Sequence, residues 1–462
     1  MARKNGREQH LSALRSLSSM QPREPLERGV EAIRALGATE AAEFLDALRM
    51  RTLVSRRLAG VAETDPVVRE CVSVLSGKVE RLRFMHEVLE TNLRRVEDMA
   101  LDLGIPVFGG KGIGAHTMYP DRSVRDFNDI DLFLRDRADA AKVATELRVV
   151  HGYRYQQYEL PWFKVDPRER VVYGQIALVA PPDRPDLLNV DIHFGDYSVR
   201  HCGRLGIADA FWADKPGFHV LAPEENLACI VNNAAGDYFV TAKDTNDVLM
   251  ALSLPGFDTA RFADLLQGAH LDGFFGFIAA TLRGSTALTA EQERRLREIP
   301  VRPTLEPRPR PDTADWNRRC LGTTVHAFAT RREYGVVSAV RVAADAFSYY
   351  RKRLKLTAAP APAGAGAPAR REAAKAIELN PWTCVRLVPV DLALELVAGR
   401  GGFGGGGGAA APSVATLDLD PGIERFESPA GTYFRIDGEV FIGTVDYVLD
   451  EEVIRQAAGS TG

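Results

Sequence analysis

The stretch from Ile105 to Leu134, IPVFGGKGIGAHTMYPDRSVRDFNDIDLFL, restricts the fold more than any other part of the chain. Its pattern predicts a short apolar strand, a Gly-rich turn with one lysine, a short helix, a basic connection and a second strand. Two acidic residues, Asp129 and Asp131, are expected within that second strand. A carboxylate among apolar strand residues is costly unless it is paired or bound to a metal, so both acids need a partner.

The spacing of apolar residues divides the 462-residue chain into regions of different type. Helical spacing runs through residues 1–104 and returns over 199–356, while strand and helix patterns alternate over 105–198. Residues 357–371 have the Pro- and Ala-rich composition of a linker, and short strand-like segments follow in 372–462. We therefore expect an α+β fold, with a small mixed sheet flanked by helical regions and a small β-rich C-terminal domain.

Individual residues predict where some elements end. Gly104 follows a long helical pattern and is expected to stop it, and Thr241 or Asp244 is expected to cap a later helix. Asp437-Gly438 separates two strand-like segments and predicts a two-residue hairpin. The Gly-rich segment 399–412 lacks the Lys-Ser/Thr of a phosphate-binding loop, which favours a flexible linker.

Composition argues against several classes of protein. The formal net charge of −4 gives no bulk attraction to nucleic acid or to an anionic membrane. The five cysteines are scattered and never in C-x-x-C spacing, which argues against a disulfide framework or a structural zinc site. The N-terminus has no signal-peptide pattern, and no apolar run approaches the ~18–20 residues of a membrane span. We expect a cytoplasmic protein with no membrane partner.

The two acids of the second strand are candidate metal ligands. Side chains two residues apart on a strand point to one face, so Asp129 and Asp131 are expected to project together. Adjacent carboxylates repel each other unless a cation neutralises them, and Mg²⁺ takes carboxylates together with water and substrate phosphates. The alternative is that Asp129 caps a turn after Asn128 while Asp131 pairs with an arginine.

A third acid strengthens the metal hypothesis. Asp191 lies in the apolar segment NVDIHF, and His193, two residues later, is expected on the same face. Three carboxylates on adjacent strands can hold two metal ions for in-line phosphoryl transfer. His193 is a further candidate for the site, with a hydrogen-bonded core histidine as the alternative.

A Gly-rich turn precedes the acids. Glycines let a backbone approach a phosphate closely, and a helix that begins at Ile113 would add free N–H groups. The alternative is a tight strand-to-helix turn whose lysine faces solvent, and an arginine in the basic connection can equally be solvated. The candidate nucleotide-binding residues are Gly109, Gly110, Lys111, Gly112 and Arg125.

Together these residues resemble the DNA-polymerase-β-like nucleotidyltransferase superfamily. The resemblance is greatest to an uncharacterised bacterial branch that reads K-G, Y-P, R and D-I-D-L, with a third acid followed by a histidine as in Asp191-Ile192-His193. It covers about Val79 to Leu254 and includes a helix start at Leu221-Ala222-Pro223-Glu224. The resemblance implies a polymerase-β-like catalytic core for residues 105–198.

The resemblance also implies a reaction. Asp129 and Asp131 would hold two Mg²⁺ ions, and Asp191 would complete the site of the ion that activates the acceptor. Lys111 and the backbone of the glycines around it would hold the triphosphate of an NTP, and pyrophosphate would leave. The acceptor would be a hydroxyl of a small molecule, peptide or protein, since the acidic net charge disfavours nucleic acid.

Two other hypotheses use the same residues. A degenerate nucleotidyltransferase fold could act as a nucleotide-sensing or protein-binding module without catalysis. A kinase or phosphohydrolase would release NDP or free phosphate in place of pyrophosphate. Lys243, Asp244 and Asp247 are candidates for closing over the nucleotide or the acceptor, with a solvated helix face as the alternative.

Overall fold

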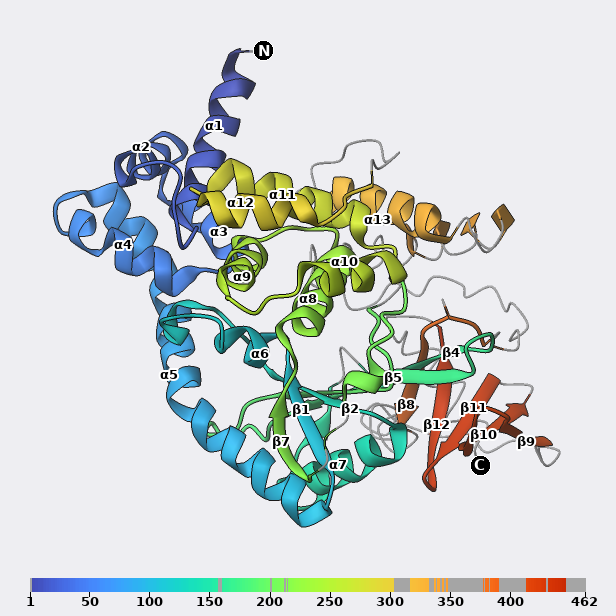
Figure 1. Cartoon of the computed structure of the whole chain (residues 1–462). Coiled ribbons are helices and arrows are strands. Elements are labelled where there is room, and N and C mark those ends of the chain that lie inside the picture. The colour runs from blue at the N-terminus through green and yellow to red at the C-terminus, as the bar shows by residue number, and fades with distance from the viewer. Residues whose placement is uncertain are drawn as a thin grey trace, which may run out of the picture.

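The computed structural model describes residues 2–156, 160–199, 202–211, 213, 215–302, 316–331, scattered positions from 336 to 347, most of 377–389, 413–428 and 431–445. The predicted linkers at 357–371 and 399–412 lie outside the described residues. The N-terminal part is helical, with α1 (Ala2–Leu17), α2 (Leu26–Leu36), α3 (Ala38–Ala47), α4 (Arg51–Thr64) and α5 (Pro66–Leu103). In Figure 1, α5 runs from the other N-terminal helices down along the edge of the sheet.

The described strands form one mixed sheet in the order β7-β1-β2-β6-β5-β4-β8-β12-β11-β10-β9, with β3 paired to β5. In the order of the chain, the seven strands that come first are β1 (Pro106–Gly110), β2 (Ile130–Leu134), β3 (Arg154–Tyr155), β4 (Trp162–Asp166), β5 (Val171–Val179), β6 (Val190–Phe194) and β7 (Gly217–Val220). β2 lies antiparallel to β1 and parallel to β6. Helices and a mixed sheet together agree with the α+β class expected from the sequence.

The C-terminal strands continue the same sheet. They are β8 (Val385–Pro389), β9 (Ser413–Leu417), β10 (Asp420–Ser428), β11 (Gly431–Ile436) and β12 (Glu439–Thr444). β8 pairs antiparallel with β4, where Trp162 lies opposite Arg386. Arg137, the first residue of α7 (Arg137–Val149), forms ion pairs with Asp420 and Asp437. Strand pairing therefore joins the C-terminal strands to the central sheet, beside which Figure 1 shows them, and ion pairs join them to α7.

The central strands send alternate side chains into two separate cores. Ile130 and Leu132 pack with α5 and α7 on one face. Phe108 and Phe133 pack on the other face, in a second core that also holds residues of α1–α4. Asp131 shares the face of Phe133. The remaining helices are α6 (Gly112–His116), η1 (Arg122–Val124), η2 (Ala208–Ala210), α8 (Pro223–Asp237), α9 (Ala242–Ser253), α10 (Thr259–Gly268), α11 (Asp272–Ser285), α12 (Ala290–Glu298) and α13 (Trp316–Arg331). None of the described helices has both the length and the apolar character needed to cross a membrane.

The predicted end signals are confirmed. Gly104 ends α5 in the left-handed conformation, with a φ of 70°. Thr241 caps α9 through a reciprocal capping box with Asp244. Asp437 and Gly438 join β11 to β12 with φ values of 52° and 85°, the backbone that a two-residue hairpin turn of this type requires.

A histidine pair joins α5 to the segment that carries the acids. The ring of His86 on α5 lies 5.2 Å from the ring of His116 on α6, and Phe127 contacts both rings. Burial, together with the nearby charge of Arg125, lowers the pKa of His116 to about 3. The folded protein therefore holds His116 in its neutral form at physiological pH.

Acid should destabilise the protein through His116. An unfolded histidine takes up a proton as the pH falls below about 6.5, whereas folded His116 does not, so stability is lost from pH 6.5 downward at about 1.4 kcal/mol per pH unit. We expect His116→Gln to remove about 2 kcal/mol of the fall in unfolding free energy between pH 7.5 and 5.0. Urea titrations at the two pH values measure this, and an equal fall in parent and variant would contradict the assignment.

Candidate active site

The register between β2 and β6 brings the candidate acids together. The strands are parallel, with Asp131 beside Asp191 and Phe133 beside His193. Paired residues in neighbouring strands point to the same face of a sheet. One donor atom from each of Asp131, Asp191 and His193 lies within 4.8 Å of the other two, and all three side chains are buried. The sheet therefore gathers these residues into one cluster, which we call the acidic cluster.

Each carboxylate of the acidic cluster has a defined partner. Lys111 Nζ lies 2.6 Å from Asp131 Oδ1, and His193 Nε2 lies 3.2 Å from the same oxygen. Gln175 of β5 donates a hydrogen bond from its Nε2 to Asp191 Oδ2 at 2.9 Å. These contacts fix the orientation of both carboxylates, as buried ionisable groups require.

Burial and charge set the protonation of the cluster. Burial, followed by the charge of Lys111, lowers the pKa of His193 to about 4, so the ring is neutral and its Nε2–H donates to Asp131. Burial alone would raise the pKa of Asp131, but the charge of Lys111 and the hydrogen bond from His193 outweigh it and hold that pKa below its usual value. Burial opposes the charge of Lys111 as well, yet Asp131 keeps the pKa of the ammonium well above its usual value.

The donor set fits a divalent cation. Carboxylate oxygens are the ligands that Mg²⁺ prefers in proteins, and Asp131 and Asp191 present them side by side. His193 Nε2 is engaged with Asp131, so this histidine orients a carboxylate oxygen that could bind the cation. Two carboxylates facing one ammonium form an anionic site that a further cation can neutralise.

Lys111 enters the site from a strained turn. Its φ is 43°, and among the described residues of the run Gly109–Gly112 only this lysine has a positive φ. Its backbone oxygen accepts hydrogen bonds from the Ala115 N–H and from Asn226 Nδ2 at 2.8 and 3.3 Å. A non-glycine residue in this backbone region costs roughly 1–3 kcal/mol. The surrounding contacts therefore hold a strained residue whose side chain reaches Asp131.

The glycines beside Lys111 are required by packing. A Cβ on Gly109 would lie 2.5 Å from the ring of Phe218, and one on Gly110 would overlap Phe133 and lie 2.8 Å from Leu221. Of the glycines predicted to bind nucleotide, Gly112 lines the pocket over the acidic cluster, while Gly109 and Gly110 are absent from its lining. Close packing of β1 explains the glycines at 109 and 110.

A polar pocket of about 280 Å³ opens over the acidic cluster. Asp129 lines it from the bend before β2, outside the strand in which the sequence predicted it. The strand begins one residue later, at Ile130, whose N–H donates a hydrogen bond at 2.8 Å to the backbone oxygen of Asn189, the residue before β6. The charged residues that line the pocket are Arg49, Arg51, Lys111, Arg125, Lys243, Asp126, Asp129, Asp131, Asp191 and Asp237.

Arg125 is committed to a carboxylate of the helical region. Its Nε and Nη2 donate to both oxygens of Asp247 on α9, at 2.7 and 2.8 Å, and the Tyr119 hydroxyl also donates to Asp247 at 2.8 Å. Burial would raise the pKa of Asp247, but Arg125 outweighs it and holds that pKa below its usual value. Lys243, at the start of α9, lines the pocket and pairs with Asp244 at 3.2 Å.

Sequence patterns missed several lining residues. Arg49 precedes Met50 in the loop between α3 and α4, and Arg51 is the first residue of α4; two arginines near a helix start give no local signal of function. Gln175 lies in a strand-like segment, and only its hydrogen bond to Asp191 in the structure identifies it as part of the site. The other lining residues without a sequence signal include Asp126, Tyr197, Asn233 and Asp237.

The region of the chain that forms the pocket matches a known protein family. Residues 37–283, more than half of the chain, match a family described as uncharacterised nucleotidyltransferases. The chain belongs to this family. The protein is therefore an enzyme, a nucleotidyltransferase. The matched range includes every residue that lines the pocket. No curated protein and no solved structure gives a significant match to the chain.

A substitution at Gly110 tests the packing explanation. We expect Gly110→Ala to lower the unfolding free energy by about 1–3 kcal/mol without any nucleotide present, because the added methyl group overlaps Phe133 and Leu221. Gly60→Ala on α4 is the control, since a Cβ there meets no atom within 4 Å and alanine favours the helix. Urea denaturation measures both variants, and a Gly110→Ala protein as stable as its parent would show that packing does not demand glycine.

The Arg125–Asp247 pair should be a major element of stability. Asp247→Ala leaves the buried guanidinium of Arg125 without its carboxylate, which costs about 3–5 kcal/mol. Glu31→Ala in the exposed Arg28–Glu31 pair is the matched control, with an expected change below about 1 kcal/mol. Similar losses for the two variants in thermal or chemical unfolding would contradict the prediction.

Proposed function

We propose that this nucleotidyltransferase transfers an NMP from an NTP to a hydroxyl or similar group of a small molecule, peptide or protein, with release of pyrophosphate. The observation that supports this proposal is the buried cluster of Asp131, Asp191 and His193 beneath a pocket lined with basic residues. Acids of this kind suit a divalent metal, and the basic residues suit a phosphate chain.

Two Mg²⁺ ions are proposed to bind at the acids of the pocket. Asp129 and Asp131 would hold them, and Asp191 would complete the site on the side of the acceptor. Bound Mg²⁺ would neutralise phosphate charge and favour the deprotonated acceptor oxygen. His193 and Gln175 each donate to one carboxylate oxygen and so keep the ligands in place.

The residues of the turn are proposed to have different parts in nucleotide binding. Lys111 and Gly112 line the pocket and would contact the triphosphate. Gly109 and Gly110 would contribute by letting β1 pack closely against its neighbours, which brings Lys111 of the following turn next to Asp131. Arg125 would hold the wall of the pocket in place beside the bound phosphates through its ion pair with Asp247.

The proposed reaction balances without a covalent enzyme intermediate. The acceptor oxygen forms a bond to the α-phosphorus, the bond from that phosphorus to the β-bridging oxygen breaks, and pyrophosphate leaves with the electron pair. The acceptor proton passes to solvent. The side chains act by positioning and by charge neutralisation, which is how most phosphoryl-transfer sites work.

Substitution of the acids tests the proposal. We expect the parent protein to release pyrophosphate from at least one NTP in the presence of Mg²⁺ and its acceptor, and chelation to abolish the release. Asp131→Asn and Asp191→Asn should lower the rate by about 10²–10³-fold or more, because each removes a negative charge that would hold the metal ions, and with them the electrostatic stabilisation of the transition state. The measurement is pyrophosphate release with each of the four NTPs and extracts or defined acceptors.

Asp98→Asn, an exposed acid on α5, is the matched control and should keep the parent rate. Release of NDP or free phosphate in place of pyrophosphate would favour a kinase or phosphohydrolase. Equal pyrophosphate release by the parent and both active-site variants would overturn the assignment of the acidic cluster.

A further inference from the structure

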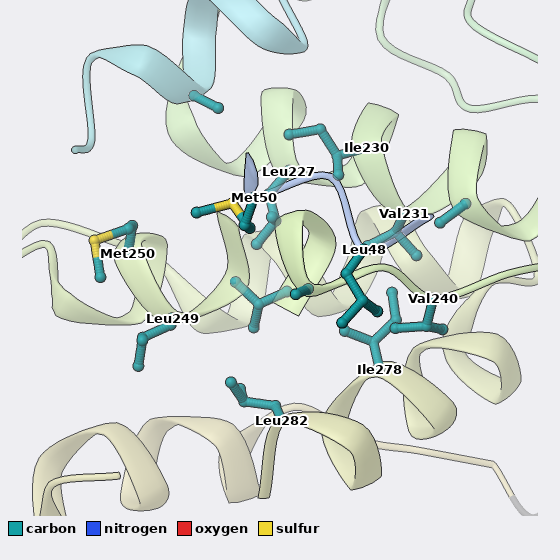
Figure 2. Close-up of a cluster of buried hydrophobic side chains, with 14 of the residues drawn as sticks. Leu48, Met50, Leu227, Ile230, Val231, Val240, Leu249, Met250, Ile278 and Leu282 are labelled. Carbon is teal, nitrogen blue, oxygen red and sulfur yellow. The ribbon is translucent and has the colours of Figure 1, made fainter. Parts of the chain in front are cut away.

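The loop between α3 and α4 is anchored deep in the helical core. Leu48 and Met50 are fully buried in the second core, and Figure 2 shows Met50 beside Leu227 and Leu48 beside Val231 and Val240. The backbone oxygen of Leu48 accepts a hydrogen bond from the Lys243 N–H of α9 at 3.2 Å. A segment far from the catalytic strands in sequence is therefore fixed against the helices that wall the pocket.

Arg49 lies between these two anchors in a left-handed conformation. Its φ is 59°, and its N–H donates to Asp46 O at 3.2 Å. A non-glycine residue in this region is held there by its surroundings at a cost of roughly 1 kcal/mol or more. With Leu48 and Met50 directed into the core, the Arg49 side chain lines the pocket together with Asp129 and Asp131.

Arg49 differs in charge pairing from the other basic residues of the pocket. Arg51 pairs with Asp46 and Asp126, and the other three basic side chains each pair with an aspartate. Across the described part of the chain, the structure gives Arg49 no carboxylate partner within ion-pair distance. Its guanidinium meets the neutral amide of Asn128, whose oxygen accepts from Nη2 at 3.2 Å when that amide is oriented to suit its neighbours.

We propose that Arg49 binds the triphosphate of the nucleotide. A guanidinium offers a planar fork of N–H donors that matches phosphate oxygens, and the Arg49 guanidinium has no carboxylate oxygen of the described residues within ion-pair distance to occupy that fork. The buried neighbours hold it in place before the nucleotide arrives, so little ordering is needed on binding. This inference rests on the proposed function and assigns a binding role to the N-terminal helical region.

Binding of inorganic triphosphate tests Arg49 independently of the base and of the acceptor. We expect isothermal titration with Mg²⁺-triphosphate to show about 10–100-fold weaker binding to Arg49→Gly than to the parent. Glycine suits a φ of 59°, so this variant should melt no lower than the parent. Arg49→Lys keeps the charge but loses the fork and should fall between the two.

Arg28→Met, which removes one exposed positive charge from α2, is the matched control and should bind like the parent. If Arg49→Gly binds triphosphate within twofold of the parent, the role of Arg49 is wrong while the proposed reaction stands. A fall in kcat with unchanged triphosphate affinity would also overturn it. If the parent binds neither triphosphate nor any NTP, this inference and the proposed function both fail.

Discussion

The parallel register of β2 and β6 is the constraint on which the site depends. It sets Asp131 beside Asp191 on one face of the sheet, where both carboxylates are buried. A shift of one residue would turn one acid into the apolar core formed with α5 and α7. The ammonium of Lys111, the His193 ring and the Gln175 amide then make the pair tolerable by neutralising or hydrogen-bonding its oxygens.

The site is completed by elements from distant parts of the chain. The sheet supplies the acids, the turn after β1 supplies Lys111, and α8 and α9 form the opposite wall. The loop between α3 and α4 adds Arg49, and the start of α4 adds Arg51, because the apolar residues of the loop are buried in the same core as those helices. Stability and function are therefore coupled here, since the contacts that fold the helical region also position charged groups at the acids.

Local patterns were enough for much of the site and of the fold. Asp131, Asp191 and His193 stand out because each interrupts an apolar strand, and strand periodicity places the last two on one face. The ends at Gly104, Thr241 and Asp437-Gly438 follow from backbone preferences of single residues. The sequence pattern predicts Asp129 within the strand, whereas β2 begins one residue later, at Ile130. The start of a strand depends on hydrogen bonds to its partner, which the local pattern does not contain.

Local patterns along the chain are enough to identify buried charged residues and the ends of helices and strands, because both depend on a few neighbouring residues. Which side chains come into contact depends on the packing of distant elements. The pairing of Arg125 with Asp247, the packing that demands Gly109 and Gly110, and the entry of Arg49 into the pocket join residues far apart in the chain. Such contacts depend on strand register and on helix packing, which local composition does not encode.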